Sequence, residues 1–111
     1  MKTRELTGAA LDWAVAKCEG AASIRFDGKN TRIGTGGHFN PSTDWSQGGP
    51  IIEREGICLY FNPEDATAFE WHAEDRSHAW YLEGPAPLIA AMRCYVASKL
   101  DDEVEIPEEL K

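Results

Sequence analysis

Three carboxylates in one short stretch are the residues best placed to carry out chemistry. Residues 42–55 read S-T-D-W-S-Q-G-G-P-I-I-E-R-E and contain Asp44, Glu53 and Glu55. Carboxylates whose pKa values are driven apart by their surroundings can act as acid and base, and they can also bind a metal ion. Arg54 lies between the two glutamates, however, and this pattern is typical of a solvated charged face. We therefore rank chemistry below two other interpretations of the stretch, a structural corner and a partner-binding surface.

The histidines provide a second set of reactive side chains. His72 and His78 are predicted to face each other across a hairpin, close to Glu70 and Glu74. The sequence has no H-E-x-x-H, C-x-x-C or G-x-S-x-G motif, and the glycine run at 34–37 lacks the Lys and Ser or Thr of a phosphate loop. We therefore expect a solvated hairpin face, with no metal and no cofactor.

Composition excludes several classes of function. The chain of 111 residues has a formal net charge of −8, and six of its nineteen carboxylates lie within residues 101–111. An acidic chain repels nucleic-acid phosphates and anionic membranes. No apolar run reaches the roughly 18 residues that span a bilayer, and no apolar signal segment follows Met1. With three cysteines at unrelated spacings, we expect a cytosolic protein with free thiols at Cys18, Cys58 and Cys94.

Two long helices are predicted, and they are expected to position the residues discussed above. The first is predicted from Gly8 to Glu19, because Thr7 suits the N-cap, Leu6 and Leu11 have the spacing of a hydrophobic staple, and Gly20 suits a left-handed end. The second is predicted from Pro87 to Leu100, with its apolar side chains at helical spacing.

Short strands are predicted between the two helices. Residues 23–27 and 31–34 flank the turn residues of 27–30, and residues 57–61 indicate a well-buried strand. A single helical turn is expected after Asn62. Residues 68–74 alternate in polarity and are expected to pair with residues 78–82 as a hairpin that has one wet face.

Residues 42–55 are predicted to form two short helical pieces, capped by Ser42 or Thr43 and separated at Gly48 or Gly49. In this structural corner Trp45 is a core anchor, and its replacement by Ala should cost about 3–5 kcal/mol. If the corner binds a partner instead, Arg54→Ala should weaken capture without unfolding the protein. The binding residues would then be Asp44, Trp45, Gln47, Glu53, Arg54 and Glu55.

Three blocks of the sequence resemble a known family. They are L-T-G-A-A-L-D-W-A-V-A-K (6–17), P-S-T-D-W-S-Q-G-G-P-I-I-E-R-E-G-I (41–57) and P-L-I-A-A-M-R-C-Y-V-A-S-K-L (87–100). The chain resembles the NinX family of small proteins from lambda-like bacteriophages and prophages, and V-E-I-P-E-E-L (104–110) is similar to the family's ending. The resemblance implies expression inside an infected bacterium. It carries no assigned activity or catalytic residue.

These observations lead to one expected fold and three expected functions. We expect a single α+β domain over residues 1–111, in which a small, mainly antiparallel sheet packs against the N- and C-terminal helices and a helical corner lies in the middle. The favoured function is a non-enzymatic phage accessory protein that binds a host or phage protein, or itself, in the bacterial cytoplasm. The alternatives are an acidic decoy that inhibits a host nucleic-acid enzyme, and a small enzyme that uses the corner carboxylates or the histidine pair.

Overall fold

The computed structural model describes residues 1–34, 37–63 and 69–111. Along the chain these residues form η1 (Thr3–Glu5), α1 (Gly8–Cys18), β1 (Ile24–Phe26), β2 (Thr31–Ile33), α2 (Trp45–Glu55), β3 (Cys58–Phe61), β4 (Trp71–Glu74), β5 (Tyr81–Gly84), α3 (Pro87–Leu100) and η2 (Glu108–Leu110). No helix among the described residues is long and apolar enough to cross a membrane.

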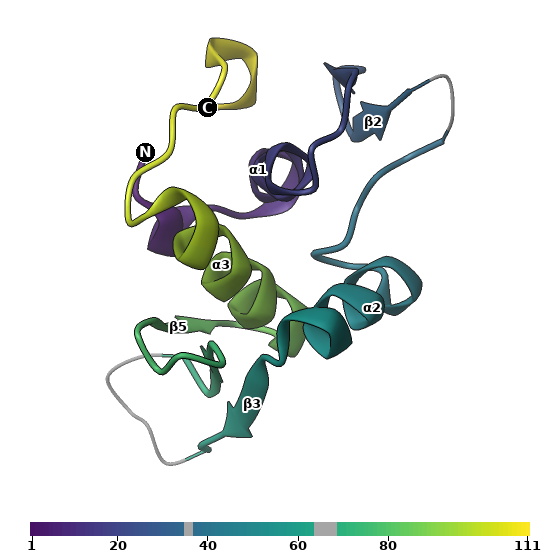
Figure 1. The fold of residues 1–111 in the computed structure, drawn as a ribbon. Coiled ribbons are helices and arrows are strands. Elements are labelled where there is room, and N and C mark those ends of the chain that lie inside the picture. The colour runs from purple at the N-terminus through teal and green to yellow at the C-terminus, as the bar shows by residue number, and fades with distance from the viewer. Residues whose placement is uncertain (35–36, 64–68) are drawn as a thin grey trace.

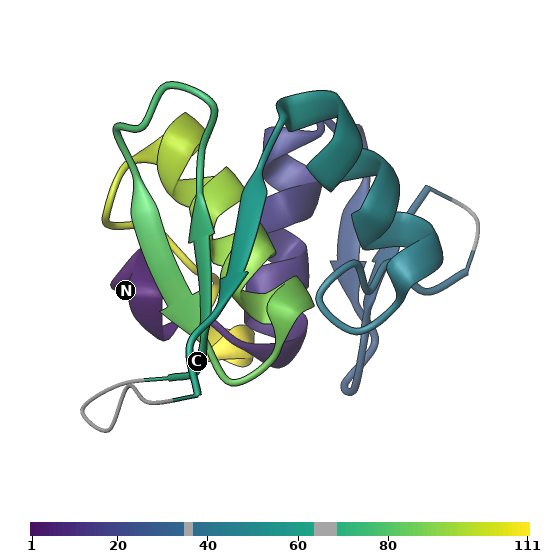
Figure 2. The ribbon, with the colours of Figure 1, turned by 90° about the horizontal axis from the view of Figure 1, so that it is seen from below.

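Helix α3 forms the middle layer of the fold (Figures 1 and 2). One side of it covers a three-stranded antiparallel sheet with the strand order β3-β4-β5. Its other side packs against α1, which also contacts the β1–β2 hairpin. The prediction of an α+β fold, with N- and C-terminal helices packed on antiparallel strands, is therefore confirmed. The strands form two separate small sheets instead of the one expected.

The core lies between these layers, and α3 contributes to it all the way round. Residues 90–97 of α3 are all buried, including the small side chains opposite the predicted apolar stripe. Alanine at those positions lets α1 approach closely on one side while the sheet packs on the other. On the sheet, Leu59, Ala73 and Leu82 pair in register and pack into this core.

The acidic segment after α3 is part of this core. Val104 and Ile106 are buried, although most of their neighbours are exposed carboxylates. The Met1 amino group donates to the Val104 carbonyl at 3.0 Å, and the Val104 N–H donates back to Met1 O at 2.9 Å. The two apolar side chains anchor this segment to the core, and its carboxylates lie on the surface.

The prediction of a well-buried strand at residues 57–61 was wrong. Ile57 is buried, but β3 is an edge strand in which Tyr60 and Phe61 are 43% and 53% exposed. A continuous apolar run is consistent with burial on both faces, but an edge strand can have the same composition. The exposure of β3 depends on its position at the edge of the sheet, which the apolar run does not encode.

The predicted wet face of the second hairpin was also partly wrong. His72 lies on the central strand, is only 4% exposed, and stacks on Tyr81 with ring centroids 5.3 Å apart. It pairs in register with Tyr60 and Glu83 rather than with His78. The predicted helical turn after Asn62 extends into residues 64–65, and the predicted strand began at residue 68; these positions lie outside the described residues.

Helix α2 is one continuous element, not the two pieces expected. Asp44, rather than Ser42 or Thr43, is its N-cap, and Gly56 ends it in a left-handed conformation with φ +67°. Pro50 lies inside the helix and removes one internal hydrogen bond. Ile51 and Ile52 pack against the core, and the helix runs unbroken through Gly48 and Gly49.

The two glycines of α2 provide a matched pair of substitutions. A Cβ on Gly48 would lie 2.5 Å from the Pro41 carbonyl oxygen, whereas a Cβ on Gly49 would meet nothing within 4 Å. We expect Gly48→Ala to destabilise the protein by about 1–3 kcal/mol through overpacking. Gly49→Ala should stabilise it by about 0.5–1 kcal/mol, because Ala favours the helix. Urea unfolding midpoints of both variants test this, and equal shifts would show that Gly48 is not tightly packed.

Candidate functional site

The six residues predicted to bind a partner lie at the two ends of α2. Asp44, Trp45 and Gln47 lie at the N-terminal end, and Glu53, Arg54 and Glu55 lie at the C-terminal end. At about 1.5 Å of rise per residue, the two groups are separated by roughly 10 Å along the helix axis. They therefore form two local environments and not one cluster.

At the N-terminal end, Asp44 and Gln47 hold the preceding loop. Asp44 Oδ1 accepts from the Ser46 backbone N–H at 2.9 Å and from the Ser46 hydroxyl at 2.7 Å. The Ser46 hydroxyl and N–H bonds hold the pKa of Asp44 below its usual value. Gln47 Oε1 accepts from the Asn40 N–H at 2.8 Å, and its Nε2 donates to Asn40 Oδ1 at 3.1 Å. Both polar side chains are used in fixing the start of the helix.

Trp45 is not the predicted core anchor. Its side chain is 54% exposed, and among the described residues its indole takes part in no hydrogen bond or ring contact. Its backbone is nevertheless fixed, because Trp45 is the first residue of α2, directly after the Asp44 cap. The large stability cost expected for Trp45→Ala therefore does not apply, since an exposed ring leaves no cavity when it is removed.

At the C-terminal end, Arg54 joins three helices. Its Nη1 and Nη2 donate to the two oxygens of Glu19, just after α1, at 3.1 and 2.6 Å. Its Nε donates to Glu55 Oε2 at 2.9 Å, and its Nη2 reaches the Tyr95 hydroxyl of α3 at 3.2 Å. Arg54 is exposed, as expected of a solvated face, but it is also tied into this network, and the Glu55 side chain is only 23% exposed. Within the described part of the chain, only Glu53 of these three residues forms no ion pair, and it projects as an exposed charge.

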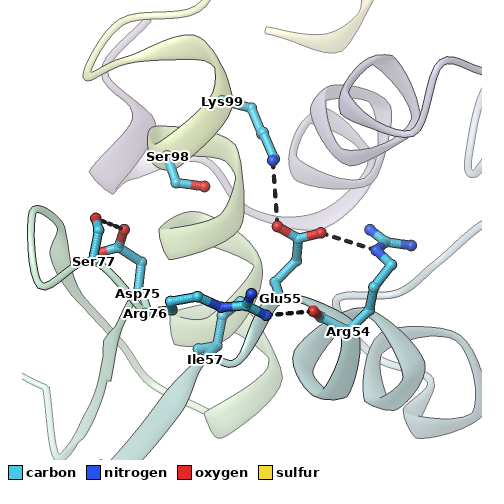
Figure 3. A pocket seen from close by; sticks show the side chains of 8 residues that line it. All are labelled: Arg54, Glu55, Ile57, Asp75, Arg76, Ser77, Ser98 and Lys99. Carbon is cyan, nitrogen blue, oxygen red and sulfur yellow. Dashed lines mark hydrogen bonds and ion pairs between the residues drawn. The ribbon is translucent and has the colours of Figure 1, made fainter.

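A polar pocket of about 330 Å³ lies beside this network. Arg76, from the turn between β4 and β5, donates through Nη2 to the Arg54 carbonyl at the end of α2, at 2.8 Å. Lys99 of α3 reaches Glu55 Oε1 at 3.3 Å. Figure 3 shows these side chains converging from α2, α3 and the β4–β5 turn. The lining residues are Arg54, Glu55, Ile57, Asp75, Arg76, Ser77, Ser98 and Lys99.

The three corner carboxylates are not arranged for joint acid–base chemistry. The Arg54 hydrogen bond holds the pKa of Glu55 below its usual value, so this carboxylate stays ionised at neutral pH. Glu53 and Glu55 are two residues apart, about 200° around the helix, and Asp44 lies at the far end. The three carboxylates therefore do not converge on a common substrate position.

The histidines and cysteines are dispersed. His78 Nδ1 lies 3.2 Å from Glu74 Oε2, and His38 Nε2 lies 2.9 Å from Arg32 Nη2. Within residues 1–34, 37–63 and 69–111, no three His, Cys, Asp or Glu side chains form a metal-binding group. Burial raises the pKa of the Cys94 thiol to about 12, whereas Cys58 is exposed on β3.

Two charged residues are buried that the sequence analysis did not identify. Arg93 of α3 is 5% exposed and donates through Nε to Leu6 O and through Nη1 to Glu83 O, both at 2.8 Å. It is the one charged residue in the run 84–98, a signal that could have marked it. Asp12 of α1 is 5% exposed and accepts from the Ser42 N–H at 2.9 Å. No sequence signal separated Asp12 from a solvated helix carboxylate.

Comparison with known proteins identifies the family of this chain. None of the curated proteins is similar enough to count as a match. The family model described as Bacteriophage P22, NinX matches residues 2–99, a span that runs from η1 through nearly all of α3. It includes α2 and the residues that join α2 to both other helices. The chain therefore belongs to the Bacteriophage P22 NinX family.

Proposed function

We propose that this NinX-family protein is a non-enzymatic protein-binding module that acts in the cytoplasm of the infected bacterium, and that Trp45 is the anchor of its binding surface. The observation that carries the proposal is the exposure of Trp45 on a rigid helix start. A large aromatic ring that is more than half exposed is available to fill a partner's pocket.

The surroundings of Trp45 support this role. Asp44 and Gln47 are fixed by hydrogen bonds to Ser46 and Asn40, so the ring is presented from ordered backbone. Little conformational entropy is then lost at this site on binding, and such pre-organisation favours affinity. The pKa of Asp44, beside the ring, is lowered, so this carboxylate is ionised at neutral pH, which favours recognition over proton transfer.

The test of this proposal compares two exposed aromatic residues. Trp45→Ala should change the free energy of unfolding by no more than about 0.5 kcal/mol, as expected for an exposed position. It should nevertheless abolish capture of a specific protein from lysate of infected cells. Tyr81→Ala, which removes a 58% exposed ring on β5, is the control and should leave capture intact.

Affinity purification with mass spectrometry measures capture, and urea unfolding checks that each variant is folded. Arg54→Ala, the variant that the sequence suggested, is a poorer probe because it also breaks the contacts with Glu19, Glu55 and Tyr95. The proposal is overturned if wild type and Trp45→Ala recover the same proteins in the same amounts.

A further inference from the structure

The open edge of β3 offers a second interaction surface, independent of Trp45. The Asn62 N–H donates to Glu70 O at 2.8 Å, and the strands stay in register back to Cys58. In an antiparallel pair, alternate residues bond to the neighbouring strand. Tyr60 and Cys58 therefore bond to β4, while Leu59 and Phe61 direct their backbone N–H and C=O groups away from the sheet.

Among the described residues, these outward groups have no backbone partner. No residue within 1–34, 37–63 and 69–111 forms a backbone hydrogen bond with Leu59 or Phe61 on that side. The opposite edge of the sheet differs, since Glu83 O on β5 accepts from Arg93 Nη1 and η1 lies alongside. In Figure 1, β3 lies at the margin of the fold, below α2 and α3.

The side chains of β3 do not protect this edge. Natural proteins protect edge strands with charged residues, prolines or bulges. The run 57–62 reads I-C-L-Y-F-N and contains no charged residue and no proline, in a chain whose net charge is −8. Tyr60 and Phe61 are both more than 40% exposed. The Glu74 carboxylate on β4 accepts from the Tyr60 hydroxyl at 3.1 Å. The strip itself carries no charge, so a second acidic chain meets less repulsion here than it would at a charged edge strand.

We propose that β3 pairs with β3 of a second copy of this chain to form a symmetric dimer. The edge is complementary to itself about a two-fold axis at Tyr60. Leu59 of each copy then lies opposite Phe61 of the other, and four backbone hydrogen bonds satisfy all the outward groups of both strands. The two sheets become one continuous six-stranded sheet.

Side chains add to this pairing on both faces. The two Tyr60 residues oppose each other in a non-hydrogen-bonded pair on the outer face, where Cα atoms are about 4.5 Å apart. On the helix-facing side, Phe61 meets Leu59 of the second copy, and such cross-strand apolar pairs stabilise sheets. Because β3 has four residues, the contact is smaller than the roughly 1,200 Å² of a standard interface, so the dimer is weak and depends on concentration.

The test is sedimentation of the full chain at rising concentration, with two variants that change the charge equally. Wild type should shift from 12.3 kDa towards twice that mass. Tyr60→Lys places two like charges at the two-fold axis and should raise the dimer dissociation constant by at least about tenfold. Trp45→Lys, at the start of α2 and about 15 Å along the helix from the end that leads into β3, also replaces an exposed aromatic ring by a charge and should leave the dimer unchanged.

Disulfide trapping gives a second measurement, which can detect the dimer even when it is weakly populated. In a Cys58→Ser background, Tyr60→Cys should form a disulfide-linked dimer with oxidised glutathione, because the paired Cα distance suits a disulfide. Tyr81→Cys in the same background should not. The proposal is overturned by a wild type that stays monomeric up to about 1 mM, by equal effects of the two lysine variants, or by equal cross-linking at the two positions. Trp45→Ala should leave the dimer intact, so this inference and the proposed function fail separately.

Discussion

Replacing Arg93 by Ala should lower the free energy of unfolding by about 3–5 kcal/mol, because it leaves two carbonyls without donors and removes a buried side-chain stem. Those carbonyls belong to Leu6 and Glu83, so one guanidinium joins the N-terminal segment and β5 to α3. Burial lowers the pKa of Arg93, which shows that its charge is costly to hold in this place. The hydrogen bonds offset that cost only while both are formed.

Urea unfolding measures the effect, and two further variants define its cause. Arg93→Lys keeps the charge but lacks the planar fork that reaches two carbonyls at once, so it should recover only part of the loss. Arg76→Ala removes an exposed guanidinium with one hydrogen bond, to Arg54 O, and should cost less than about 1 kcal/mol. Similar losses for Arg76→Ala and Arg93→Ala would show that Arg93 is not a special contact.

Asp12→Asn should stabilise the protein by on the order of 2–3 kcal/mol at pH 7 and by almost nothing at pH 4. Burial raises the pKa of Asp12 from 3.8 to about 6, although the Ser42 N–H acts in the opposite direction. Between these two values the folded protein holds a proton that the unfolded chain has lost. Stability from this group is therefore greatest at low pH, falls as the pH rises from about 4 to 6, and stays reduced above 6.

The amide variant tests this because it is neutral at every pH. The new amide side chain would keep an oxygen for the Ser42 N–H, and its NH₂ could donate to the buried Ser42 Oγ. Unfolding midpoints from pH 4 to 8 should diverge between wild type and variant across that window. Parallel curves would mean that Asp12 titrates normally and is hydrated.

Sequence reasoning succeeded where local signals agree with the fold. α3 begins at Pro87 and ends at Leu100, as predicted, because a first-turn proline and a helical apolar pattern act together. α1 begins and ends within one residue of the predicted bounds, with Gly20 left-handed after it. Thr7 occupies the predicted N-cap, but its side chain makes no capping hydrogen bond.

The failures share one physical cause, which is that burial depends on distant segments. Trp45 has the size of a core anchor, yet the fold leaves 54% of it exposed. His72 was placed on a wet face, yet Tyr81 stacks on it. Gly48 was expected to end a helix, but it is needed because the Pro41 carbonyl approaches so closely. The carboxylates of the corner could be located from sequence, whereas the Arg54 contact with Glu19 links residues 35 apart and could not.

The burial of α3 on every side also determines how the protein can come apart. The sheet and α1 bury opposite sides of the same helix, so neither layer can detach without exposing apolar surface that belongs to both. Partial unfolding therefore costs nearly as much as complete unfolding, which is the condition for all-or-none behaviour. Neither the sheet nor α1 is expected to be stable alone, because each buries its apolar side chains against α3.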